Sequence, residues 1–214
     1  HYFAKFQNNF EKKEIKNIIN FDLLKLKIEN QFNYQNFEKK GFMKLLFNKR
    51  KSNLEYTLSK NLFKFKYSDK LNEPNFVYEG NINFKPFFSE SSANLTEIDY
   101  NQLLNPNSVL IQFLKTEILN NKNLNITTSV NSNQIETYKD LINLILKVKI
   151  SEGLIDINET SLSWLDYVDF KISDSLIYVK DNNLVLDAYV VIKINNHNEV
   201  YKFFQTPRNY RKKI

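Results

Sequence analysis

The chain has 214 residues, of which 42% are apolar and 25% are charged, and its formal net charge is +6 at pH 7. This apolar content, with 18 Phe and 12 Tyr, is enough to bury a core and excludes a wholly disordered chain. The absence of cysteine excludes a disulfide scaffold and a thiolate metal site, and no apolar stretch reaches the roughly 18 residues of a membrane-spanning helix.

Residues 1–88 predict a first module in which a helix packs on strands. Tyr2 to Phe6 alternate in the period-two manner of a strand. A helix is then predicted from apolar residues at helical spacing, namely Ile15, Ile18, Ile19, Leu23 and Leu26. A short helix is expected at Phe42 to Phe47. The segments Leu54 to Lys66 and Asn75 to Lys85 read as strands.

Residues 89–122 predict a connection between two modules. A polar loop is followed by Pro106, a residue that suits the start of a helix. The helix is expected to run to about Asn121. Its inward side chains are predicted to be Val109, Leu110, Phe113, Leu114 and Ile118.

Residues 123–205 predict a second module with the same order of elements. It begins with a strand at Leu124 to Val130. Apolar residues from Ile135 to Val148 then predict a helix, with Asn133 as its N-cap and Gly153 beyond its end. A short helix is expected at Ser161 to Tyr167. Strands are predicted at Val168 to Ile172, Leu176 to Lys180, Leu184 to Ile194 and Val200 to Phe204, with Asn- and Asp-rich turns between them. Residues 206–214 form a basic tail.

Four pairs of similar segments favour an internal duplication. Lys16 to Ile28 matches Lys139 to Ile150 when one residue is dropped, and the matches continue in the same order along both halves. The strongest are Leu54 to Lys66 with Val168 to Lys180, and Asn75 to Lys85 with Asn183 to Lys193. The sequence therefore predicts an α+β protein of two tandem β-α-β-β-β-β modules, each with a helix on an antiparallel sheet.

This predicted order of elements resembles the cystatin-like, or monellin-like, architecture, in which a curled antiparallel sheet wraps a long helix. The inhibitory Gln-x-Val-x-Gly hairpin of the cystatins does not occur in this sequence. The resemblance therefore implies a topology and does not imply protease inhibition.

Charge is unevenly distributed along the chain and suggests a phosphate-binding surface. Residues 1–70 carry a net charge of +9, residues 71–205 carry −7, and the last nine residues carry +4. A basic stretch from residue 39 to residue 51, interleaved with Phe, makes nucleic-acid binding one alternative, and a solvated surface is the other. The candidate binding residues are Lys39, Lys40, Lys44, Lys49, Arg50 and Lys51, together with Phe87 and Phe88 at a loop edge.

The sequence offers little catalytic equipment. The chain has only two histidines, His1 and His197, so a Ser-His-Asp triad or a His-rich zinc site is disfavoured. Three glycines provide no glycine-rich phosphate loop. Carboxylates such as Asp166 and Asp187 remain for metal or glycosidic chemistry, but their spacing fits no calcium loop. We therefore predict no enzymatic activity, no cofactor and no metal.

Asn, Lys, Ile, Phe and Tyr are abundant while Gly, Ala, Pro and Arg are scarce, as AT-rich codons would supply. With the absence of cysteine, this composition resembles that of the extracellular part of mollicute surface lipoproteins. The resemblance implies a membrane-associated adhesion or protein-binding role outside the cell. The functional prediction is a non-enzymatic binding or scaffolding segment that recognises a protein partner from a host or from its own complex. Nucleic-acid binding is the alternative, and the sequence leaves open whether the chain binds a small-molecule ligand.

Overall fold

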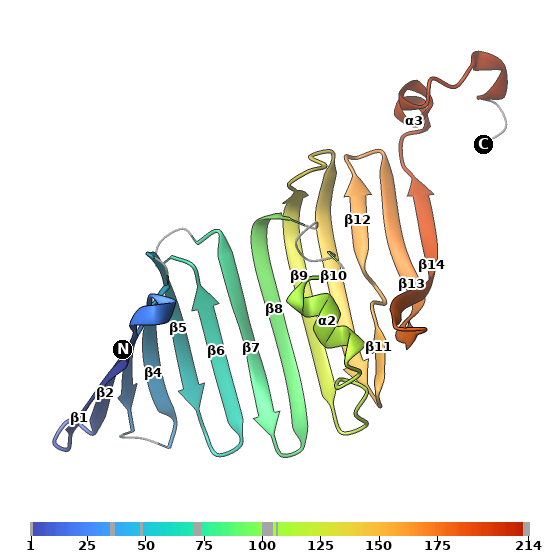
Figure 1. The fold of residues 1–214 in the computed structure, drawn as a ribbon. Coiled ribbons are helices and arrows are strands. Elements are labelled where there is room, and N and C mark those ends of the chain that lie inside the picture. Colours follow the sequence, from blue (N-terminus) through green and yellow to red (C-terminus); the bar gives the residue numbers. More distant parts are fainter. Residues whose placement is uncertain are drawn as a thin grey trace. The chain divides into compact units, whose positions relative to one another are not determined.

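The computed structural model describes residues 2–34, 37–47, 49–70, 74–99, 105 and 107–211. Its described part is a sheet of fourteen strands, and every register that the structure defines is antiparallel (Figure 1). From β1 to β10 each strand pairs with its neighbours in sequence, and β14 pairs with β13. The strands are β1 Tyr2–Asn9, β2 Glu14–Phe21, β3 Leu26–Asn33, β4 Lys39–Phe47, β5 Arg50–Leu58, β6 Leu62–Ser68, β7 Phe76–Phe84, β8 Phe87–Ile98, β9 Asn125–Ile135, β10 Leu141–Ser151, β11 Leu154–Asp156, β12 Ser161–Trp164, β13 Val168–Lys180 and β14 Asn183–Ile194.

The helices of the described residues are short. The α-helices are α2 (Val109–Lys115) and α3 (His197–Phe203), and two 3₁₀ turns occur at Asp22–Leu24 and Arg208–Tyr210. The chain divides into two compact units. Unit 1 comprises residues 1–95 and 123–128, and unit 2 comprises residues 96–122 and 129–214.

The predicted α+β fold is wrong, because both long helices are absent from the described structure. The segment from Ile15 to Leu26 forms β2, a 3₁₀ turn and the start of β3. In β2, Ile15 and Ile19 face one side of the sheet and Ile18 faces the other, so the apparent helical spacing is carried by a two-sided strand. β-Branched residues lose less side-chain freedom in strands than in helices, which favours this outcome.

The second predicted helix, from Ile135 to Val148, is largely replaced by β10. An apolar run such as Leu141–Ile145 cannot be assigned to helix or strand by periodicity alone when both faces are partly buried. Asn143 adopts a left-handed backbone conformation with φ of 56°, which no helix interior accepts. The strand pairs with β11 and β12 and leads to Ile150, a buried core residue.

The shorter predicted helices and one predicted strand also differ from the structure. Residues 42–47 belong to β4, and residues 161–164 form β12. The predicted strand Val200 to Phe204 overlaps α3, which Asn196 caps by accepting a hydrogen bond from the Glu199 N–H. The connecting helix exists as α2 but ends at Lys115, and Pro106 lies outside the described residues.

The aligned segments of the proposed duplication do not form equivalent elements. Leu54 to Lys66 includes the turn between β5 and β6, whereas Val168 to Lys180 forms the single strand β13. The predicted tandem modules, and with them the cystatin-like topology, are therefore wrong. The boundaries at residues 88, 122 and 205 stay a prediction from sequence.

The sheet of unit 1 has two chemically different faces. Across β3 to β7, one row of register partners reads Gln31, Phe42, Glu55, Lys66 and Glu79. The neighbouring row on the opposite face reads Phe32, Gly41, Tyr56, Phe65 and Gly80. We call these the charged face and the aromatic face. The charged face includes ion pairs such as Lys66 with Glu79 at 3.7 Å.

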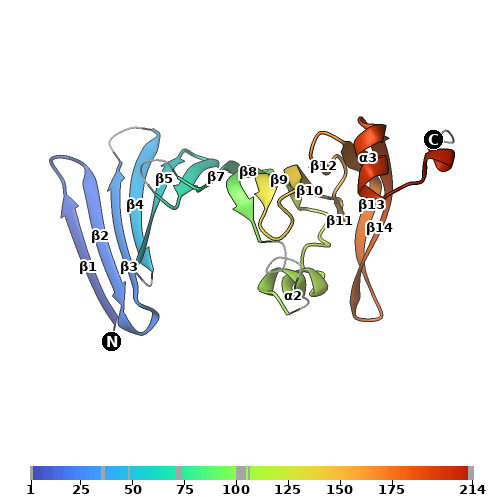
Figure 2. The ribbon, with the colours of Figure 1, turned by 90° about the horizontal axis from the view of Figure 1, so that it is seen from above.

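Unit 2 holds most of the buried apolar side chains among the described residues. They include Ile135, Ile150, Ile155, Ile157 and Val168, each less than 9% exposed. Figure 2 shows α2 to one side of β10 and β11, and α2 also contacts β14. The core of this unit is therefore formed mainly by strand residues.

Aromatic side chains attach α3 to the sheet of unit 2. The ring of Trp164, at the end of β12, lies 4.5 Å from that of Phe203 and 5.6 Å from that of Tyr167, both edge-on. Tyr201 is buried, and its hydroxyl donates to the carbonyl oxygen of Arg211 at 2.6 Å. The helix and the segment after it are thus fixed against the end of the sheet.

Candidate binding surfaces

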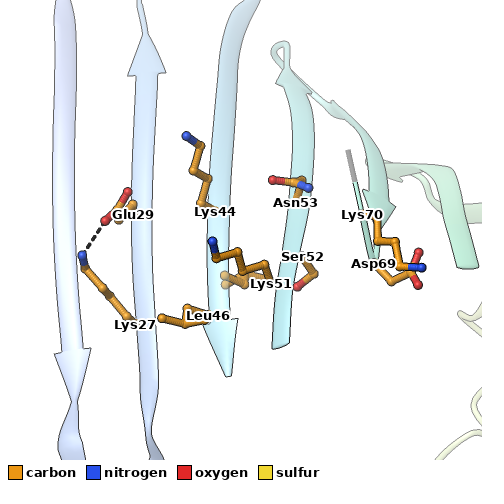
Figure 3. A pocket seen from close by; sticks show the side chains of 10 residues that line it. Lys27, Glu29, Lys44, Leu46, Lys51, Ser52, Asn53, Asp69 and Lys70 are labelled. Atoms are coloured by element: carbon orange, nitrogen blue, oxygen red, sulfur yellow. Dashed lines mark ion pairs between the residues drawn. The ribbon is translucent and has the colours of Figure 1, made fainter. Parts of the chain in front are cut away.

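A groove of about 580 Å³ crosses the charged face of unit 1 (Figure 3). Lysines line it from four places: Lys27 on β3, Lys44 on β4, Lys51 on β5 and Lys70 after β6. Pairing of β3, β4 and β5 brings three of them onto the same face. The acidic side chains that line it are Glu29 and Asp69, so the groove is electropositive.

Local interactions order one end of the groove. The Lys27 Nζ lies 2.6 Å from the Glu29 Oε1. This hydrogen bond lowers the pKa of Glu29 below its ordinary value, and the charges of Lys27 and Lys44 add to the shift. Lys44 also lies 5.8 Å from the centroid of the Phe42 ring. Lys51 and Lys70 are exposed, which leaves them accessible to an anion.

The predicted basic stretch is divided by the fold. Lys44 and Lys51 line the groove, but Lys39 and Lys40 are at the other end of β4, and Lys40 is about 13 Å along the strand from Lys44. Lys49 lies in the β4–β5 turn with φ of 70°. Arg50 pairs with Phe47 on the aromatic face. The stretch from residue 39 to residue 51 therefore forms no continuous basic patch.

The two predicted phenylalanines point in opposite directions. Phe87 pairs with Phe84 on the aromatic face, whereas Phe88 pairs with Asn83 on the charged face. Each is 37% exposed. They begin β8 at the β7–β8 turn and do not line the lysine groove.

A row of aromatic rings on the other face of unit 1 was missed by sequence reasoning. We call Phe32, Tyr56, Phe63, Phe65 and Tyr78 the aromatic row. Successive ring centroids along it lie 5.1–6.2 Å apart. All five side chains are half-buried, and no α-helix among the described residues of unit 1 covers them. The signal was present in the alternation of Phe63 and Phe65 with lysines, but the strand pairing that assembles the row was not readable.

Gly41 makes room for the Tyr56 ring, the second ring of this row. A Cβ at Gly41 would overlap the Tyr56 ring, which lies over this position. The Tyr56 hydroxyl reaches past it and donates to Asn30 Oδ1 on β3 at 2.8 Å. Burial raises the pKa of Tyr56 above its ordinary value, because it disfavours the charged phenolate.

We expect Tyr56 to make stability pH-dependent in the alkaline range. Its folded-state pKa is raised, so the stabilisation is fully present below the unfolded pKa of about 10 and is lost as pH rises through the folded value. Urea unfolding of the wild type and of Tyr56→Phe between pH 8 and pH 11 measures how the free energy of unfolding depends on pH. The wild type should lose more stability than the variant above about pH 10. If the free energy of unfolding falls equally with pH in both proteins, the Tyr56 hydroxyl does not contribute to the pH dependence of stability.

The carboxylates singled out in the sequence are not brought together. Asp166 lies in the β12–β13 turn, while Asp187 pairs with Leu176 well along β13. No group of three or more acidic or histidine side chains that could hold a metal ion occurs in the described ranges. None of the helices in the described part of the chain is long and apolar enough to cross a membrane.

Neither a family model, a curated protein nor a solved structure matches this chain.

Proposed function

We propose that the chain is a non-enzymatic binding segment of a surface-exposed or secreted protein and that it recognises a protein partner through the aromatic row. The observation that carries this proposal is a row of five half-buried rings with no α-helix over it among the described residues of unit 1. Aromatic side chains are enriched in protein interfaces because they bury a large area at small entropic cost.

The chemistry of the aromatic row favours a protein over a small ligand as the partner. The rings spread over β3, β5, β6 and β7, so the row extends across a broad part of one sheet face. Tyr56 and Tyr78 carry hydroxyls bonded to Asn30 and Ser91, so the row combines apolar area with polar groups. Interfaces with that mixture are typical of protein recognition.

Photo-crosslinking from the two faces of β6 tests the proposal. A photoreactive phenylalanine analogue replaces Phe63 on the aromatic face in one variant and the adjacent Lys64 on the charged face in the other. Both are expressed in cells of the organism that makes the chain. We expect a discrete heteromeric protein adduct from position 63 and none from position 64. Equal adducts from both positions, or adducts to the chain itself alone, would contradict the proposal.

The lysine groove supports a second candidate function, the binding of a nucleic acid or another polyanion. Four lysines line one groove on unit 1, and phosphate contacts by lysine need no sequence-specific geometry. A nucleic acid bound there would lie on the charged face and leave the aromatic row free.

A series of charge-reversal variants tests whether the lysine groove binds nucleic acid. The triple variant Lys44→Glu, Lys51→Glu and Lys70→Glu should bind a fluorescent single-stranded 30-nucleotide DNA more weakly, and its salt slope should fall by about 2. The matched control reverses Lys12, Lys60 and Lys85, which are exposed in turns away from the groove. Fluorescence anisotropy across a salt series gives both quantities. If the two triple variants lose affinity equally, the groove is not the site.

A further inference from the structure

The strand β14 is an edge of the sheet with an open hydrogen-bonding side. It pairs with β13, and no second partner strand for it occurs among the described residues (Figure 1). An edge strand of twelve residues presents a row of unpaired backbone N–H and C=O groups that a further strand can join.

The middle of β14 carries four consecutive exposed apolar or aromatic residues. Tyr189 is 70% exposed, Val190 57%, Val191 55% and Ile192 58%, so both faces of this four-residue stretch are largely exposed. Charged side chains are one of the devices that protect edge strands from pairing. The other edge strand, β1, carries Lys5 near its centre, whereas β14 has no charge between Asp187 and Lys193.

We propose that two copies of this chain associate by antiparallel pairing of β14 with β14, centred on Val190. In that register Val190 lies opposite Val190 of the second copy, and Tyr189 lies opposite its Val191. Asp187 then lies opposite Lys193 of the second copy, and the symmetry repeats this opposite-charge pair. The charges of β14 are thus complementary to themselves about Val190, the central residue of the uncharged segment from Ala188 to Ile192 that lies between them.

This pairing closes on itself, whereas pairing β14 with β1 of another copy would not. A two-fold interface uses the same strand of both copies and stops at a dimer. A β14-to-β1 contact leaves one free β14 and one free β1, and so would not stop at two copies. The paired length is limited to about residues 186–194, because β14 ends at Ile194, which lies opposite Leu186 in this register. Two strands bury a small area, so we expect a weak dimer with a micromolar Kd.

Single cysteines test the register, because the chain has no native cysteine. In the proposed dimer two Val190→Cys residues face each other within disulfide range, at a Cα separation of about 4.5–5.5 Å. Leu186→Cys is the matched control, since Leu186 is 50% exposed on the same strand but lies opposite Ile194. Under mild oxidation we expect disulfide dimers from Val190→Cys and none from Leu186→Cys. Equal crosslinking of the two would indicate parallel pairing, and no crosslinking from Val190→Cys would also overturn the proposal.

A charge-reversal pair tests the same register without covalent chemistry. Asp187→Lys places lysine opposite lysine twice and should weaken the dimer by about tenfold. Adding Lys193→Glu restores opposite charges and should recover most of the affinity. Sedimentation equilibrium over a concentration series measures Kd, and far-UV circular dichroism confirms that each variant is folded. Growth beyond a dimer, a monomer at all concentrations, or failure of the double variant to recover would each contradict the proposal.

Discussion

A Gly80→Ala variant is expected to lose about 1–3 kcal/mol of unfolding free energy. A Cβ at this position would lie 2.5 Å from the Glu90 carbonyl oxygen and 2.6 Å from the Ser91 Cβ on the neighbouring strand β8. Because the Glu90 carbonyl oxygen is a backbone atom, the clash is relieved only if β7 and β8 move apart. Alanine would otherwise be favoured over glycine in a strand by about 0.5–1 kcal/mol, so the clash must exceed that gain.

Urea unfolding followed by far-UV circular dichroism measures the change at Gly80. Asn81→Ala is the matched control, because Asn81 is the next residue of β7 and is exposed on the charged face. We expect the control to change stability by less than about 0.5 kcal/mol. A Gly80→Ala protein as stable as the wild type would mean that β7 and β8 are not as close at this point as the structure has them.

Asn158→Ala should destabilise unit 2 by about 3 kcal/mol, because it leaves buried donors unpaired. The Asn158 Oδ1 accepts from the Ser175 backbone N–H at 2.8 Å and from the Ser175 hydroxyl at 2.9 Å. That hydroxyl oxygen in turn accepts from the Ile157 N–H at 2.8 Å, and Ser175 is only 7% exposed. Ser175 lies at the register shift between β13 and β14, so this network fixes the bulge.

The single tryptophan of the chain reports unfolding of the same unit. Trp164 lies on β12, which pairs with β13, so its fluorescence follows urea unfolding of unit 2. Asn158→Asp keeps an acceptor oxygen at the same place and should lose much less stability than Asn158→Ala at pH 7. Equal losses in the two variants would show that the side-chain oxygen is not what holds Ser175.

Some strands of this fold and the connecting helix α2 were predicted from sequence, whereas the two long helices predicted to pack on the sheets were wrong. Alternation placed strands correctly at Tyr2 to Phe6 and Leu184 to Ile194, which lie within β1 and β14. The Asp181-Asn182 turn was also confirmed, with φ values of 49° and 60°. Helical spacing was misleading at residues 15–26 and 141–148, because a strand with apolar groups on both faces contains the same spacings.

The lysine groove shows why sequence proximity predicted only part of a surface. Lys44 and Lys51 were named because they belong to one basic stretch, and they do lie together. Lys27 and Lys70 join them only through strand pairing, which composition does not reveal. Conversely Arg50 is adjacent to Lys51 in sequence but faces the opposite side, since neighbouring residues of a strand alternate.

The neighbour-to-neighbour pairing of β1 to β7 has a consequence for how unit 1 assembles. Each pairing closes only a short loop, so its entropic cost is small and every hairpin can form without waiting for a distant segment. Order can then spread strand by strand from any starting hairpin, as in a one-dimensional array. The same path runs in reverse on unfolding, so amide exchange should be fastest in β1 and slow progressively toward β5 and β6.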